Sequence, residues 1–178
     1  MFPSPILMGE GRVRVMKNIS KNRIRIALQK SGRLSEESFN LLTRCGIKVK
    51  NRKEQLFCHS ENFPLDLLLV RDDDIPNLVI DGICDFGIVG TNVLQEKSLY
   101  RNNNGDKKTF EKIRDLDFGN CRLAIAIPEN FSYENLQDLS AKRIATSYPH
   151  LLGNFLQENK INAEITVLSG AVEIAPRL

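Results

Sequence analysis

One stretch, Leu65–Gly90, constrains the fold more than any other part of this sequence: LDLLLVRDDDIPNLVIDGICDFGIVG. Its first six residues are a short apolar run, which is typical of a buried strand. A turn of one arginine and three aspartates follows. The next apolar residues are spaced as on one helix face, with Asp74 as N-cap, Pro76 in the first turn and Gly82 at the end. Phe86–Gly90 then predicts a second strand. Polar residues thus follow a strand's carboxyl end, the edge where open α/β sheets bind ligands.

A second charged turn lies nearer the N-terminus. Residues 24–28 alternate in polarity, which predicts a strand, and a small cationic turn follows at residues 29–33. A helix is expected next, with Ser35 as N-cap and Gly46 as its stop. Backbone N–H groups at the start of a helix, with Lys30 and Arg33 beside them, favour an anion such as phosphate. An ordinary loop with solvated basic side chains is the alternative.

The second half of the chain repeats the α/β pattern. Thr146 and Ser147 lie where a predicted strand becomes a predicted helix, so hydroxyls and backbone N–H groups come together there. They form either a helix cap or a contact to a phosphate or ribose. Further strands are predicted at residues 47–50, 123–127, 143–146 and 165–168, and helices at 133–139 and from about 149 to 156. Residues 91–119 look polar, with no predicted element.

These patterns predict an α/β protein of two lobes, residues 23–119 and 120–178, after a disordered or non-native extension at 1–22. The net charge of +3 is too small to argue for a nucleic-acid partner. No apolar run reaches the roughly 18 residues of a membrane helix. The four cysteines lack C-x-x-C spacing; we expect three of them to be buried thiols, which fits a reducing cytoplasm.

Common catalytic motifs are missing from the sequence. There is no P-loop, G-x-G-x-x-G, G-x-S-x-G or H-E-x-x-H. Covalent and zinc mechanisms therefore have no support in the sequence, and no residue is assigned as a metal ligand. Two α/β lobes with cationic and hydroxyl-bearing turns suit a phosphorylated small molecule bound in a cleft.

Five blocks of sequence, in order, resemble one enzyme family, the ATP phosphoribosyltransferases of histidine biosynthesis in their long bacterial form. The blocks are IALQKSGRL (26–34), LLLVRDDDIPNLVIDGICDFGIVGTNVL (67–94), LDFGNCRLAIA (116–126), KRIATSYPHLL (142–152) and SGAVEIAPR (169–177). The resemblance implies a transferase that joins ATP to phosphoribosyl pyrophosphate (PRPP), releases pyrophosphate and requires Mg²⁺. It also implies a two-lobed fold like the type II periplasmic binding proteins, and a homo-oligomer.

The resemblance also assigns roles to residues. Lys30, Ser31, Gly32 and Arg33 would hold nucleotide phosphates. The turn of Arg71, Asp72, Asp73 and Asp74 would line the nucleotide side of the cleft, faced by Thr146, Ser147 and Tyr148 from the second lobe. Glu173 would be the catalytic residue near the PRPP end. Such a reaction needs positioned substrates and charge stabilisation more than a nucleophile.

The chain departs from the family pattern at its end. In the family, the segment after Ala-Pro-Arg continues into a loop that grips the PRPP 5′-phosphate, and later into a regulatory domain. Here the sequence stops at Leu178. We therefore expect a truncated chain with an incomplete fold, marginal stability and little or no transferase activity. A non-catalytic nucleotide-binding module, or a subunit that needs a partner chain, is the alternative.

Overall fold

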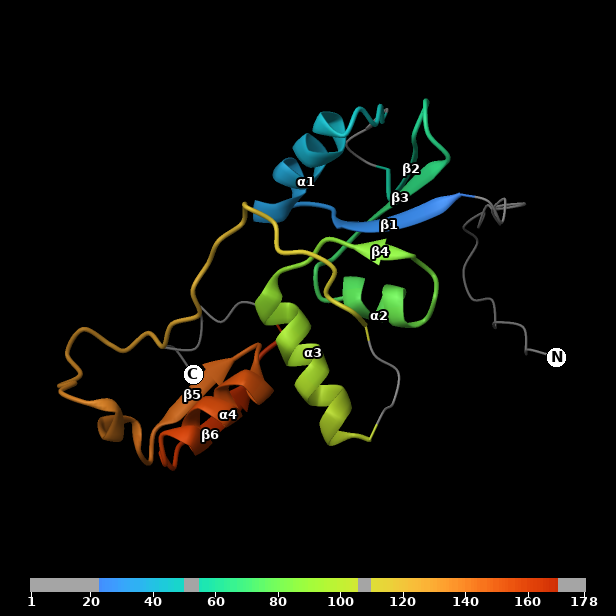
Figure 1. The fold of residues 1–178 in the computed structure, drawn as a ribbon. Coiled ribbons are helices and arrows are strands. Elements are labelled where there is room, and N and C mark those ends of the chain that lie inside the picture. The colour runs from blue at the N-terminus through green and yellow to red at the C-terminus, as the bar shows by residue number, and fades with distance from the viewer. Residues whose placement is uncertain (1–22, 50–54, 106–109, 170–178) are drawn as a thin grey trace, which may run out of the picture.

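The computed structural model describes residues 23–49, 55–105 and 110–169, which contain two β-sheets (Figure 1). The larger sheet has the strand order β2-β3-β1-β4. Strand β1 is parallel to β3 and to β4, whereas β2 is antiparallel to β3. The strands are β1 (Ile24–Gln29), β2 (Phe57–His59), β3 (Leu65–Val70) and β4 (Phe86–Gly87). Parallel strands joined through helices confirm the predicted α/β class.

Helices α1 (Arg33–Arg44) and α2 (Ile75–Ile80) cover opposite faces of this sheet. In β1, Leu28 belongs to the cluster that packs against α1, and its neighbour Ala27 belongs to the cluster under α2. Both side chains are fully buried. Successive residues of a strand point to opposite faces, so neighbouring residues are both apolar where the strand is covered on both sides.

The structure changes three details of the predicted first unit. Strands β3 and β4 are not neighbours, because β1 lies between them and pairs with both. Helix α1 begins two residues before Ser35, after Gly32, whose φ of 108° suits glycine. The Ser35 hydroxyl instead donates to the Lys30 carbonyl oxygen at 3.1 Å. Asp74 does precede α2, with Pro76 in its first turn, but its side chain makes no capping hydrogen bond.

The smaller sheet pairs β5 (Arg143–Thr146) with β6 (Glu164–Val167) in parallel, and helix α4 (Pro149–Glu158) connects them. A short 3-10 helix, η1 (Leu136–Leu139), precedes this unit. Leu139, Leu152, Leu156 and Ile161 form its buried core. The predicted strands at 143–146 and 165–168 and the helix after Tyr148 are therefore confirmed.

Two elements were missed and three predictions were wrong. Helix α3 (Thr91–Asn103) occupies a stretch that we expected to be irregular, and β2 was not predicted. Residues 123–127 belong to no strand, because their backbone has no ladder partner within the described residues. Val49 forms only an isolated bridge with Ser60. Two cysteines, Cys58 and Cys84, are buried rather than three; Cys45 and Cys121 are exposed. The predicted extension at 1–22 lies outside the described residues.

A buried carboxylate ties the amino ends of β1 and β3 together. Asp66 Oδ1 lies 2.7 Å from Arg23 Nε and 2.8 Å from His59 Nδ1, and the side chain of Asp66 is 1% exposed. Burial by itself would raise the pKa of Asp66, but the hydrogen bonds from His59 and Arg23 and their charges outweigh it and lower the pKa. The carboxylate therefore stabilises the fold in its ionised form.

The substitution Asp66→Asn tests this carboxylate. We expect a loss of about 1.5 kcal/mol in the free energy of unfolding at pH 7, because a buried charge-assisted hydrogen bond is lost. The folded pKa lies below the unfolded value near 3.8, so the stabilisation is present above pH 3.8 and declines as the pH falls through the folded pKa. Urea unfolding of both proteins at pH 7 and pH 3 checks it. An unchanged difference between the proteins at the two pH values would contradict it.

Candidate functional site

Two charged turns meet at the carboxyl edge of the larger sheet. Strands β1 and β3 pair in register up to Gln29 and Val70, and the Lys30 N–H donates to the Val70 carbonyl oxygen at 2.8 Å. Residues 30–33 and 71–74 therefore start side by side. Adjacent parallel strands deliver their following turns to one edge, which is where ligands bind in open α/β sheets. The sequence predicted that each turn follows a strand, whereas the pairing of β1 with β3 is seen only in the structure.

The side chain of Tyr148 joins this edge from the smaller unit. Burial raises the pKa of its hydroxyl, and the negative charge of Asp72 raises it further. The charge of Arg33 acts in the opposite direction, as does a hydrogen bond to the side chain of Asn92. Arg33, Asp72 and Tyr148 come from three different predicted segments, so the fold brings together one residue from each of them.

The structure adds two residues that the sequence analysis did not select. Asn92 lies in the first turn of α3 and is hydrogen-bonded to Tyr148, and exposed Cys121 is close enough to raise the pKa of that hydroxyl. One signal was present in the sequence: Asn92 follows shortly after β4, a third strand that ends at the same sheet edge. No comparable sequence signal marks Cys121.

The remaining residues of the two turns are exposed and engage their own backbone. Arg71 Nε lies 3.6 Å from Asp73 Oδ1, with both side chains more than half exposed. Asp72 Oδ1 accepts the Asp73 N–H at 3.0 Å. In the other turn, Gln29 Oε1 accepts the Leu34 N–H at 3.1 Å, so that side chain occupies part of the N-terminus of α1. Lys30, Ser31 and Gly32 are exposed beside it.

At the start of α4, Thr146 makes a local contact and Glu96 of α3 accepts from the first N–H groups of the helix. Thr146 Oγ1 accepts the Tyr148 N–H at 2.9 Å. The His150 and Leu151 N–H groups donate to the carboxylate of Glu96 in α3 at 3.0 and 2.9 Å. A phosphate would have to displace Glu96 to use these N–H groups. The hydroxyls of Thr146, half-buried, and Ser147, exposed, remain the predicted contacts there.

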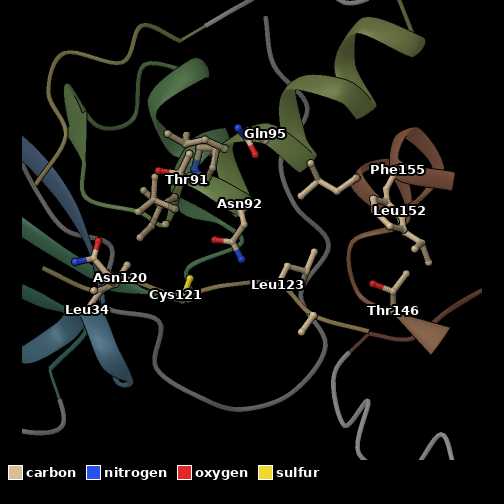
Figure 2. A pocket seen from close by; sticks show the side chains of 18 of the residues that line it. Leu34, Thr91, Asn92, Gln95, Asn120, Cys121, Leu123, Thr146, Leu152 and Phe155 are labelled. Atoms are coloured by element: carbon tan, nitrogen blue, oxygen red, sulfur yellow. The ribbon is translucent and has the colours of Figure 1, made fainter. Parts of the chain in front are cut away.

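A large open hollow adjoins the polar cluster (Figure 2). Asn92 projects into it from α3, with Leu34 and Cys121 on one side and Thr146 on the other. Its volume is about 1880 Å³, whereas a small-molecule pocket usually measures roughly 300–1,000 Å³. Much of its lining comes from the irregular residues 110–128, and Leu123 is 56% exposed. The hollow is therefore larger than a typical small-molecule pocket.

Comparisons with known proteins identify the family. The family model for HisG, ATP phosphoribosyltransferase, matches residues 71–178. The chain belongs to the ATP phosphoribosyltransferase family. It is 51% identical over 158 residues to the ATP phosphoribosyltransferases of two Xylella fastidiosa strains, M12 and 9a5c. The match covers 89% of this chain and 52% of each relative, so the chain spans about half the length of these curated relatives.

A solved structure of the same family shares the fold. The chain resembles a protein in the ATP phosphoribosyl transferase (HisG:HisZ) complex from Thermotoga maritima, with a TM-score of 0.63 and 24% identity. The match covers 86% of this chain and 68% of that one. At this identity the likeness establishes the α/β fold only.

Glu173 lies outside the described residues. Within residues 23–49, 55–105 and 110–169, no group of three His, Cys, Asp or Glu is arranged to hold a metal ion. In the same ranges, no helix is long and apolar enough to cross a membrane.

Proposed function

We propose that this chain supplies the nucleotide-binding part of an ATP phosphoribosyltransferase, the enzyme that condenses ATP with PRPP to give phosphoribosyl-ATP and pyrophosphate. The observation that carries the proposal is that the turns at residues 30–33 and 71–74 start side by side at the sheet edge, where the Lys30 N–H donates to the Val70 carbonyl oxygen. The charges of Arg33 and Asp72 and the side chain of Asn92 all act on the Tyr148 hydroxyl there. A cation at the start of α1 attracts phosphate oxygens, and the amide and phenol groups supply directed hydrogen bonds. Family membership adds the substrates: ATP at this edge, and PRPP beyond it.

The proposed mechanism relies on positioning. Lys30, Ser31, Gly32 and Arg33 would hold nucleotide phosphates, while Arg71 and Asp72–Asp74 line the same side of the cleft. Thr146, Ser147 and Tyr148 would close on the nucleotide from the smaller unit, and Glu173 would act near the PRPP end. Holding two substrates in line makes the transfer effectively unimolecular, which lowers the barrier without a covalent intermediate.

Mg²⁺ fits this site only as part of a metal–substrate complex. Mg²⁺ usually takes one or two protein carboxylates and completes its shell with phosphate oxygens and water. Asp72 lies beside Tyr148, and Asp73 is paired with Arg71, so Asp72 and Asp74 offer the available carboxylates. When bound, the ion would neutralise charge on the departing pyrophosphate.

We further propose that the two sheets are the two lobes of a type II periplasmic-binding-protein-like fold, with boundaries near residues 23–119 and 120–178. Each sheet has its own buried core, which supports two lobes, although α3, which precedes the proposed boundary, packs on α4 of the smaller unit. The TM-score of 0.63 to an enzyme of the family supports the overall arrangement. As in the family, a homo-oligomer and a cytoplasmic location are part of the proposal.

Calorimetric titration of the chain with Mg-ATP tests the nucleotide site. We expect Arg33→Ala to weaken ATP binding by about tenfold, because a charge-assisted hydrogen bond to phosphate contributes about 1.5–3 kcal/mol. Arg44→Ala is the matched control, since Arg44 is exposed at the other end of the same helix, about 16 Å away at 1.5 Å per residue. Equal losses in both variants, or none in Arg33→Ala, would contradict the assignment.

The second candidate function is that of a subunit. In this role the chain binds nucleotide but depends on a partner chain for turnover. One solved structure in which the fold recurs is a HisG:HisZ complex, which favours it. In this case the purified chain binds Mg-ATP but forms little phosphoribosyl-ATP with PRPP. Turnover by the chain alone at the rate of a full-length relative would exclude this second function.

A further inference from the structure

A buried carboxylate in α3 holds the start of α4. Glu96 is 9% exposed, and its two carboxylate oxygens accept the N–H groups of His150 and Leu151 at 3.0 and 2.9 Å. His150 Nδ1 also lies 2.7 Å from Glu96 Oε1. Because an unpaired buried carboxylate is costly, these contacts account for the position of Glu96. A negative charge is also favourable at a helix N-terminus.

Helix α4 has no N-terminal side-chain cap of its own. Its N-cap residue is Tyr148, which makes no side-chain capping bond, and Pro149 follows in the first turn. Most helices satisfy their first N–H groups with a nearby Ser, Thr, Asp or Asn side chain. Here the cap comes from a residue 54 positions away, in another helix. The contact therefore fixes tertiary structure and does more than start a helix.

Three residues of α3 contact the segment Tyr148–Leu151 at the start of α4. Asn92, Glu96 and Tyr100 are spaced four residues apart, so they lie on one face of the helix. Asn92 is hydrogen-bonded to Tyr148, and the Tyr100 ring packs edge-on against the His150 ring at 5.5 Å. Figure 1 shows α3 between the larger sheet and the unit of α4, β5 and β6. This face of α3 therefore sets where Tyr148 meets Arg33 and Asp72.

We propose that Glu96 is a positioning residue that anchors the start of α4 on α3 and so holds Tyr148 at the edge of the nucleotide site. Its effect on a ligand rests on the proposed function, whereas its effect on Tyr148 does not. The residue touches no predicted substrate group; it acts through the segment from Tyr148 to Leu151. A buried anion at this helix start also keeps the N-terminus of α4 from serving as a second phosphate site.

Two substitutions at Glu96 and one control test the proposal. Glu96→Ala removes all three contacts, and Glu96→Gln keeps one acceptor oxygen at nearly the same size. Glu158→Gln is the control, because Glu158 is exposed at the far end of α4. Amide hydrogen exchange at His150 and Leu151 and the ionisation of Tyr148 are measured in each protein, together with Mg-ATP affinity. Subtracting the ultraviolet spectrum of the matching Tyr148→Phe protein isolates the ionisation of Tyr148.

In Glu96→Ala we expect exchange at His150 and Leu151 to speed up at least about tenfold, while the amides of Ala27 and Leu67 stay protected. Release of Tyr148 from burial and from Asp72 lowers the pKa of its hydroxyl toward its ordinary value, so it ionises at a lower pH. Mg-ATP affinity falls about fivefold. Glu96→Gln lies between Glu96→Ala and the original chain in each measurement, and Glu158→Gln matches the original chain.

The possible outcomes separate the positioning role of Glu96 from the proposed nucleotide-binding function. If Tyr148 ionises in Glu96→Ala as in the original chain, the positioning role is wrong, whatever happens to ATP. If the original chain binds no Mg-ATP, the nucleotide function fails, and the exchange rates and the titration of Tyr148 still decide the positioning role. Should Glu96→Ala fail to fold, Glu96→Gln decides it by the same measurements.

Discussion

Replacing Gly87 with alanine is expected to lower the free energy of unfolding by about 2–3 kcal/mol. A Cβ atom at Gly87 would lie only 2.4 Å from Ile75 Cγ2, where α2 packs on β4. That methyl group sits on a stiff, β-branched side chain with no exposed surface, so it has little freedom to move aside. Val79 Cγ2, at 3.3 Å, limits the space from a second direction. Urea unfolding followed by circular dichroism measures the change.

The control for this prediction is Gly153→Ala in α4. A Cβ there would meet Ile165 Cδ1 at 3.8 Å, which is an ordinary contact distance. Alanine is favoured over glycine inside a helix by about 0.5–1 kcal/mol, so this variant should be as stable as the original chain or slightly more stable. The same added methyl group thus has opposite effects at two sites. A loss below about 1 kcal/mol in Gly87→Ala would show that α2 and β4 separate easily.

Replacing Leu28 with alanine is expected to cost about 3 kcal/mol. Leu28 is fully buried and belongs to the cluster formed by β1, β3 and α1, with Leu42 and Leu67 among its members. The substitution removes apolar surface from the core and leaves a cavity between the larger sheet and α1. Other contacts hold these two layers in place, so the cavity does not close. Chemical denaturation at pH 7 measures the effect. Ile83→Ala is the control, because Ile83 is 44% exposed, and it should change stability by no more than about 0.5 kcal/mol.

The Leu28 prediction also concerns the site. Leu28 lies two residues before Lys30, so β1 carries the first charged turn directly from the core. If the core positions that turn, Leu28→Ala should weaken Mg-ATP binding under conditions where the protein remains folded. Full affinity in a folded but destabilised variant would show that the turn is held by the bond from the Lys30 N–H to the Val70 carbonyl oxygen and by local contacts.

The spacing of apolar residues along the sequence was enough to predict the elements in which that spacing is regular. Leu65–Val70 is apolar except for Asp66 because α1 and α2 cover its two faces, and the sequence identified it as buried for that reason. The apolar residues of α4 recur at helical spacing because only one face of that helix is buried. The charged and small residues that follow each strand predicted the two turns, and with them the positions of Arg33 and Asp72 at the ends of the strands.

Only the tertiary structure determined α3 and the residues it contributes. This helix packs on α4, but its apolar residues do not gather into one stripe, so its sequence looks like a polar loop. Glu96 is buried because α4 brings unpaired N–H groups to it, and nothing near it in the sequence reveals them. Residues 123–127 are a continuous apolar run, which predicts a strand, yet a strand requires a neighbouring backbone, which local sequence cannot supply. The sequence thus determined what can form from neighbouring residues, whereas contacts between distant segments decided which side chains meet at the site.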